Sequence, residues 1–149
     1  MIRRPGRAGP AVLALWLAVS GAACSASTGS PSQQMSAWSR TTGARALLAN
    51  LGTDLTNALG HLRGADRTTA HTLCAILSTD AQSANDDLPT PNKAFTDQLA
   101  ATYTSLYDAA QDCYHGAGNA ALTTRAAAEL ESASAQLERA SATLSRLGG

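Results

Sequence analysis

The chain has 149 residues, enough for one domain, and a hydrophobic content of 44% predicts a folded protein rather than global disorder. Basic and acidic residues number eleven each, but three of the arginines precede residue 24, so the remainder carries a formal charge of −3. A mildly acidic chain with a single lysine is unsuited to nucleic acid, whose binding depends on clustered Lys and Arg.

The first predicted element is an export signal at residues 1–23. Arg3, Arg4 and Arg7 provide a positive start, and an uninterrupted apolar run follows from Ala11 to Val19. This run is shorter than the ~20 residues that span a bilayer. Small residues then lead directly to Cys24. Positive charge, apolar core and small residues, in this order, predict a cleavable secretory signal.

Cys24 indicates which kind of signal this is. The segment resembles a bacterial lipoprotein signal, in which the cysteine becomes the first mature residue and carries a diacylglyceryl thioether, with palmitate-type acylation. Ala22 and Ala23 match that pattern, whereas Gly21 stands where an aliphatic residue is usual, a departure that bears on processing efficiency. The resemblance implies an anchor on the extracytoplasmic face of the cell membrane. Ordinary cleavage after Ala23 or Ala26, without lipid, is the alternative.

Residues 24–36 are predicted to be the lipidated cysteine and a flexible linker. Ser25 to Ser36 is small and polar, and it contains Gly29 and Pro31. Such a composition buries too little surface to order itself. Twelve flexible residues have an r.m.s. reach of roughly 20 Å, so the domain at residues 37–149 would lie close to the membrane without packing on it.

The remaining residues are predicted to form four helices. After the signal there is no Val and a single Ile, so strand-forming residues are scarce. Leu and Ala instead recur in steps of three to four residues, which is the helical period. The predicted spans are 38–63, 67–87, 92–115 and 120–147.

Helix-breaking and capping residues separate these spans. Gly64 can end the first, Asp66 can cap the second and Asn119 can cap the fourth. The Pro89–Pro91 segment interrupts the middle, because a residue before proline avoids the helical region. Short connections favour antiparallel neighbours, so the expected fold is all-α, an up-down-up-down four-helix bundle.

The first span is the least regular. Gly43, Gly52 and Gly60 lie within it, and each costs about 1 kcal/mol relative to Ala in a helix interior. Close approach of a neighbouring helix at these positions is the favoured interpretation. The other interpretation is a mobile helix that opens to admit a partner.

Two cysteines remain besides Cys24, and in an exported protein Cys74 and Cys113 are expected to form a disulfide. A loop of this length contributes about 4 kcal/mol in the chain-entropy model. The two positions are unequally distant from the Pro89–Pro91 segment. The bridge therefore predicts an extended connection rather than a tight turn.

Three polar residues are candidate metal ligands. Asp112 and His115 have the carboxylate-x-x-His spacing of di-metal bundles, but those sites need two such units and further carboxylates. His71 and His115 could also join the reduced cysteine pair in a Cys2His2 zinc site, which an oxidising compartment disfavours. We therefore expect no metal or other cofactor, and keep His71, Asp112 and His115 as the alternative.

Motifs for catalysis are missing from the sequence. It contains no Gly-x-Ser-x-Gly, Ser-x-x-Lys or phosphate-binding glycine loop, so we expect no enzyme. Tyr103, Tyr107 and Tyr114 share one loose helix face. They either supply core volume, which is the favoured interpretation, or form an exposed binding stripe.

A pattern over residues 70–115 combines a cysteine pair, a Pro-x-Pro connection and leucines on both flanking helices. The residues that carry it are Cys74, Leu77, Pro89, Pro91, Leu106 and Cys113. It resembles small, uncharacterised helical lipoproteins of actinobacteria, which implies a fold and an envelope location but no activity. The sequence thus predicts a non-catalytic, membrane-anchored module that contacts an envelope protein or cell-wall component. A small-ligand or metal-binding bundle is the alternative.

Overall fold

The structure is a computed structural model that describes residues 29–64, 66–116 and 119–148. The predicted signal at 1–23 and the predicted lipidation site Cys24 lie outside these residues. The described part is all-α, as predicted. Its elements are α1 (Pro31–Thr42), α2 (Ala44–Arg63), α3 (Arg67–Ala84), the 3-10 turn η1 (Asn85–Asp87), α4 (Lys93–Gly116) and α5 (Ala120–Leu147).

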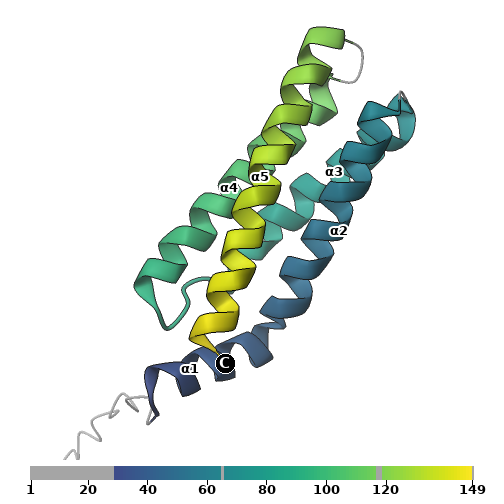
Figure 1. Ribbon diagram of the computed structural model, residues 1–149. Helices are drawn as coiled ribbons and strands as arrows, with labels where there is room; N and C mark the ends of the chain where they lie inside the picture. The colour runs from purple at the N-terminus through teal and green to yellow at the C-terminus, as the bar shows by residue number, and fades with distance from the viewer. Residues whose placement is uncertain (1–28, 65, 117–118, 149) are drawn as a thin grey trace, which may run out of the picture.

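The four long helices α2 to α5 form the predicted up-down-up-down bundle (Figure 1). Each packs on two neighbours: α2 on α3 and α5, and α4 on α3 and α5. The core between them consists mainly of Leu and Ala side chains, with Phe95 and Tyr103 as its largest buried members. Asp66 and Asn119 cap α3 and α5 as predicted, by accepting main-chain N–H groups through their side chains.

The first predicted span, 38–63, is wrong as a single helix. It is divided at Gly43, whose φ of 67° lies in the left-handed region and ends α1 before α2 begins. Close packing does not explain the other two glycines. A Cβ at Gly52 would lie at an ordinary 3.7 Å from Leu137 Cδ2, and at Gly60 no described atom would lie within 4 Å.

The predicted linker is also wrong over residues 31–36, which form the first half of α1. A capping box starts this helix: Ser30 Oγ accepts the N–H of Gln33, and Gln33 Oε1 accepts the N–H of Ser30 at 2.8 Å. Pro31 occupies the first helical position, where its missing N–H costs nothing. These local interactions offset a composition that otherwise favours a linker.

Helix α1 lies across one end of the bundle, beside the C-terminal end of α5 (Figure 1). The indole Nε1 of Trp38 donates to the carbonyl oxygen of Asp87 at 3.1 Å, and the indole ring meets Phe95 edge-on, with centroids 6.3 Å apart. Ser36 Oγ donates to the carbonyl oxygen of Gly148 at 2.7 Å. α1 therefore closes the core at this end and joins the α3–α4 connection to the end of α5.

The predicted disulfide joins Cys74 and Cys113, both buried, with Cα atoms 6.0 Å apart. Helix α3 ends at Ala84, ten residues after Cys74, whereas α4 begins at Lys93, twenty residues before Cys113. At 1.5 Å per residue the difference is roughly 15 Å. The connection covers it with η1 and an extended Leu88, with ψ 151°. It is an extended connection, as the position of the bridge predicts.

Candidate functional site

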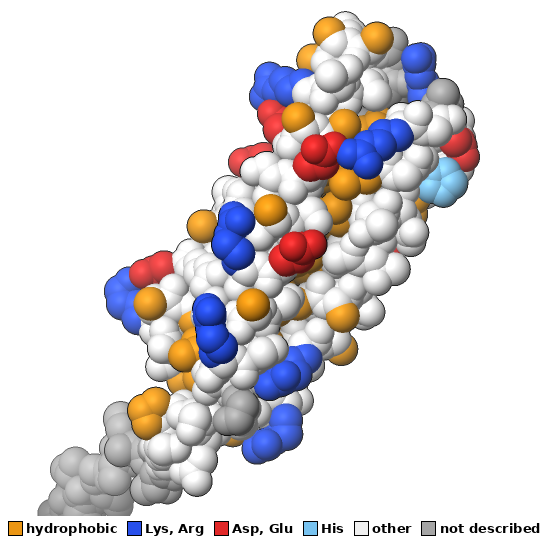
Figure 2. All heavy atoms as spheres, in the orientation of Figure 1, with side chains coloured by type: hydrophobic (Ala, Val, Ile, Leu, Met, Phe, Trp, Pro, Cys, Tyr) orange, Lys and Arg blue, Asp and Glu red, His pale blue; other side chains and the backbone are white. Residues whose placement is uncertain are grey.

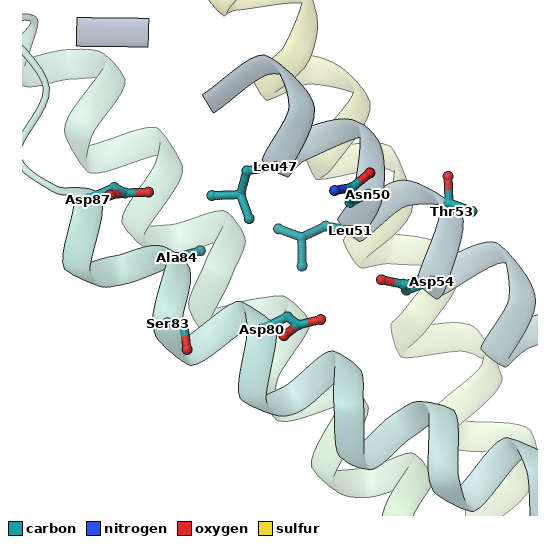
Figure 3. Close-up of a pocket in the computed structure, with 9 residues that line it drawn as sticks. All are labelled: Leu47, Asn50, Leu51, Thr53, Asp54, Asp80, Ser83, Ala84 and Asp87. Atoms are coloured by element: carbon teal, nitrogen blue, oxygen red, sulfur yellow. The ribbon is translucent and has the colours of Figure 1, made fainter. Parts of the chain in front are cut away.

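The candidate site is a groove of about 420 Å³ between α2 and the α3–η1 segment (Figure 3). Each side supplies residues at the spacing i, i+3, i+4 and i+7, which places them on one helix face. The α2 side consists of Leu47, Asn50, Leu51 and Asp54, together with Thr53, and the facing side consists of Asp80, Ser83, Ala84 and Asp87.

The floor of the groove is apolar. Leu51 and Ala84 are each only 1% exposed and belong to the core, and half-buried Leu47 forms one wall. Figure 3 shows Leu47 and Leu51 pointing toward the gap between the two helices. A side chain placed in the groove would therefore meet hydrocarbon below and polar groups at the rim.

The rim of the groove is acidic. Because α2 and α3 are antiparallel, Asp54 and Asp80 face each other at one end, and their carboxylates point toward the gap (Figure 3). Asp87 stands at the other end, beside Leu47. Within the described part of the chain none of the three forms an ion pair, and no Lys or Arg lines the groove. Low-dielectric walls strengthen the resulting negative potential.

The negative charge of Asp87 also affects Tyr103, a buried residue of the core. Burial of Tyr103, with a smaller contribution from the negative charge of Asp87, raises the pKa of the tyrosine hydroxyl to about 12. The residue as a whole is 1% exposed. The phenol therefore stays neutral at every physiological pH.

Tyr103 is buried, and Tyr107 and Tyr114 are half-buried against the core, so the core interpretation of the tyrosines is confirmed. Tyr114 has a second role because His71 on α3 stacks on its ring, with centroids 4.0 Å apart and an angle of 30°. His115 meets the same ring edge-on, at 5.1 Å.

The predicted metal candidates do not converge on one point. His71 and His115 both contact Tyr114, whereas Asp112 forms an ion pair with Arg125 of α5 at 3.0 Å. The cysteines that a Cys2His2 site would need are joined in the disulfide. Among the residues that the structure describes, no group of three or more His, Cys, Asp or Glu could hold a metal ion.

The groove residues were not among the site residues predicted from the sequence. Their signal was the repeated i, i+3, i+4, i+7 spacing, which by itself marks any exposed helix face. The pairing of these two faces depends on how α2 and α3 are rotated against each other. Only the packed structure shows that rotation.

Comparison with protein-family models, with curated proteins and with solved structures gave no match. Over residues 29–64, 66–116 and 119–148, no helix combines the length and apolarity needed to cross a bilayer. The class that the fold and the site define is a disulfide-linked, all-α bundle with an acidic groove over an apolar floor.

Proposed function

We propose that this protein is a non-catalytic module of the cell envelope, anchored to the membrane by lipid on Cys24, that binds a partner protein through the α2/α3 groove. The lipoprotein-like pattern of residues 1–23 supports the anchor. The groove supports the binding role. The resemblance to small helical lipoproteins of actinobacteria also supports the anchor and a location on the extracytoplasmic face.

One observation carries the binding role: three carboxylates without an ion-pair partner in the described chain surround an apolar floor. Lys and Arg side chains combine an apolar stem with a charged head. A basic segment of an envelope protein would place its stems on Leu47 and Leu51 and its heads at Asp54 and Asp80. Such charge complementarity raises the association rate and selects among partners.

Catalysis is not part of the proposal. Nucleophilic catalysis needs a hydroxyl or thiol within hydrogen-bond reach of a base. In the described residues, His61 is the only histidine with a hydrogen bond, and its partner is the Asp66 carboxylate, at 3.2 Å. The small-ligand or metal-binding alternative is not proposed either, because His71, Asp112 and His115 do not converge.

The anchor is tested by the intact mass of the protein from its own membrane fraction. We expect a species that begins at Cys24 with added lipid mass, and two thiols that appear only after reduction. An unlipidated species would contradict the anchor and leave the groove proposal to be tested on a soluble protein.

The groove is tested with a photo-crosslinking residue at Asn50, on the exposed rim, in the protein's own membranes. Thr104, exposed on α4 at the opposite side of the bundle, is the matched control position. We expect one discrete adduct from position 50, none from position 104, and loss of the adduct in the Asp54→Asn/Asp80→Asn variant. Equal adducts from both positions, or an adduct that survives neutralisation, would contradict the proposal.

A further inference from the structure

At the end of the bundle that α1 covers, the α1, α2 and α5 segments are basic, whereas the α3–α4 connection carries Asp86 and Asp87. Residues 31–50 and 139–148 contain four arginines and no carboxylate. These residues belong to α1, the first two turns of α2 and the end of α5, and we call this surface the basic end. Its arginines are Arg40, Arg45, Arg139 and Arg146.

Several contacts show that these segments meet. The Arg45 guanidinium would lie 3.6 Å from a Cβ built at Gly148, and Ser36 of α1 hydrogen-bonds the same residue. Arg40 and Arg146 occupy the last turns of α1 and α5. Figure 2 shows several blue basic side chains over the lower part of the molecule, where these helices come together.

The basic end has unneutralised charge. Within the described residues none of its four arginines forms an ion pair; Arg146 donates instead to the hydroxyl of Thr143, at 3.1 Å. By contrast, Arg63 and Arg125, nearer the other end, both pair with carboxylates. Glu138 directly precedes Arg139 in the sequence, but the two side chains form no ion pair.

The position of the predicted lipid anchor would bring the arginines of the basic end close to the membrane surface. Cys24 precedes the start of α1, at Pro31, by seven residues, which span at most ~25 Å when fully extended. The 28 residues of α5 make the bundle about 42 Å long. A lipid on Cys24 therefore keeps the α1 end, and with it the basic end, beside the membrane surface.

We infer that the basic end binds anionic phospholipid headgroups of the membrane in which the protein is anchored. This inference rests on the proposed function, because the lipid on Cys24 brings the surface to the bilayer. Each arginine near an anionic surface strengthens the association on the order of fivefold. The α2/α3 groove begins at the same end, with Leu47 and Asp87, and extends along the bundle to Asp54 and Asp80, so an end-on contact leaves the Asp54–Asp80 part open to a partner.

The chain contains its own reporter of this contact. It has two tryptophans, and removal of residues 1–23 leaves Trp38 alone, in α1 at the basic end. The lipidated protein, selected by intact mass, is placed on phosphatidylcholine vesicles with or without phosphatidylglycerol. Energy transfer from Trp38 to a dansyl-headgroup lipid then measures how close the basic end lies to the headgroups.

We expect at least twofold more transfer on the phosphatidylglycerol vesicles, and a return to the phosphatidylcholine value in 0.5 M salt, where charges are screened over a few ångströms. The Arg40→Gln/Arg45→Gln variant should lose most of the difference. Arg63→Gln/Arg67→Gln removes the same charge from the other end of the bundle and should keep it. Circular dichroism of both variants is the control that checks whether they are folded.

Transfer that is the same on both lipids, or that both double variants reduce equally, would overturn the inference. These outcomes are separate from a failure of the proposed function. Without a lipidated species the anchor fails before vesicles are used, whereas a lipidated protein that ignores phosphatidylglycerol refutes only the headgroup contact.

Discussion

Trp38 donates its indole N–H to the main-chain oxygen of Asp87 at 3.1 Å, across 49 residues of sequence. The side chain of Asp87 lines the α2/α3 groove, and Trp38 belongs to the helix nearest the proposed anchor. The bond therefore connects the covered end of the bundle to the rim of the groove. If α1 separated from the bundle, η1 would lose this support and the rim would change shape.

The Trp38–Asp87 bond should contribute measurably to stability. Trp38→Phe keeps an aromatic ring against Phe95 but removes the N–H, and we expect a loss of about 1 kcal/mol in the free energy of unfolding. Trp38→Ala also removes the ring and should cost about 3 kcal/mol or more. Urea unfolding followed by circular dichroism measures both. Equal losses for the two variants would show that the ring, not the hydrogen bond, holds α1.

The buried disulfide should stabilise the bundle strongly, because its core relies on small Ala and Leu side chains. Reduction, or the Cys74→Ala/Cys113→Ala variant, should lower the free energy of unfolding by about 4 kcal/mol for a loop of this length. Reductant should leave the double variant unchanged, which separates the bridge from other effects of the reductant. An unaltered unfolding midpoint after verified reduction would contradict this expectation.

Two glycines of helical segments should respond in opposite directions to the same substitution. A Cβ at Gly116 would lie 3.2 Å from Leu122 Cβ and 3.3 Å from its main-chain carbon, so Gly116→Ala should cost about 1–3 kcal/mol. Gly60 has open space around it, so Gly60→Ala should gain about 0.5–1 kcal/mol through helix propensity alone. Thermal unfolding of the pair tests this, and a shared sign would refute the packing argument.

Alkaline pH should destabilise the fold through Tyr103. Its pKa rises from 10 to about 12 on folding, so its stabilising effect is complete below pH 10 and is lost as the pH rises through 12. Two units correspond to roughly 2.7 kcal/mol. We expect the unfolding free energy to fall between pH 10 and 12 in the wild type and much less in Tyr103→Phe. Identical pH profiles would contradict this origin.

Local signals determined what the sequence could predict. The bounds of α5 follow from the Asn119 cap and a regular Leu/Ala stripe, and the disulfide follows from the number of cysteines and the expected compartment. Ser30, Pro31 and Gln33 also indicate locally where α1 begins. The small, polar residues around them indicate a linker, and the prediction followed this composition. The sequence shows a glycine at position 43, but it does not show that its φ is positive.

The groove could not be predicted in the same way, because it is a property of two helices together. Asp54 and Asp80 are far apart in sequence, and each alone has the appearance of an ordinary solvated helix residue. Their approach depends on the rotation of α2 and α3, which the buried leucines and alanines of the core determine. The ion pair of Asp112 also depends on two helices together, because Arg125 on α5 binds the carboxylate of this α4 residue.

The groove should reduce stability in the absence of a partner. Asp54 and Asp80 face each other without a cation among the described residues, so their like charges oppose the packing of α2 on α3. Asp54→Asn/Asp80→Asn should therefore raise the free energy of unfolding by up to about 1 kcal/mol while it abolishes the adduct from position 50. Glu138→Gln removes an exposed carboxylate of α5 that lies outside the groove, and it should do neither.

Chemical unfolding at low and high salt measures the first effect, because screening should remove the difference between wild type and variant. If the Asp54→Asn/Asp80→Asn variant instead had a lower free energy of unfolding than the wild type, the two carboxylates would stabilise the fold, which would contradict the prediction.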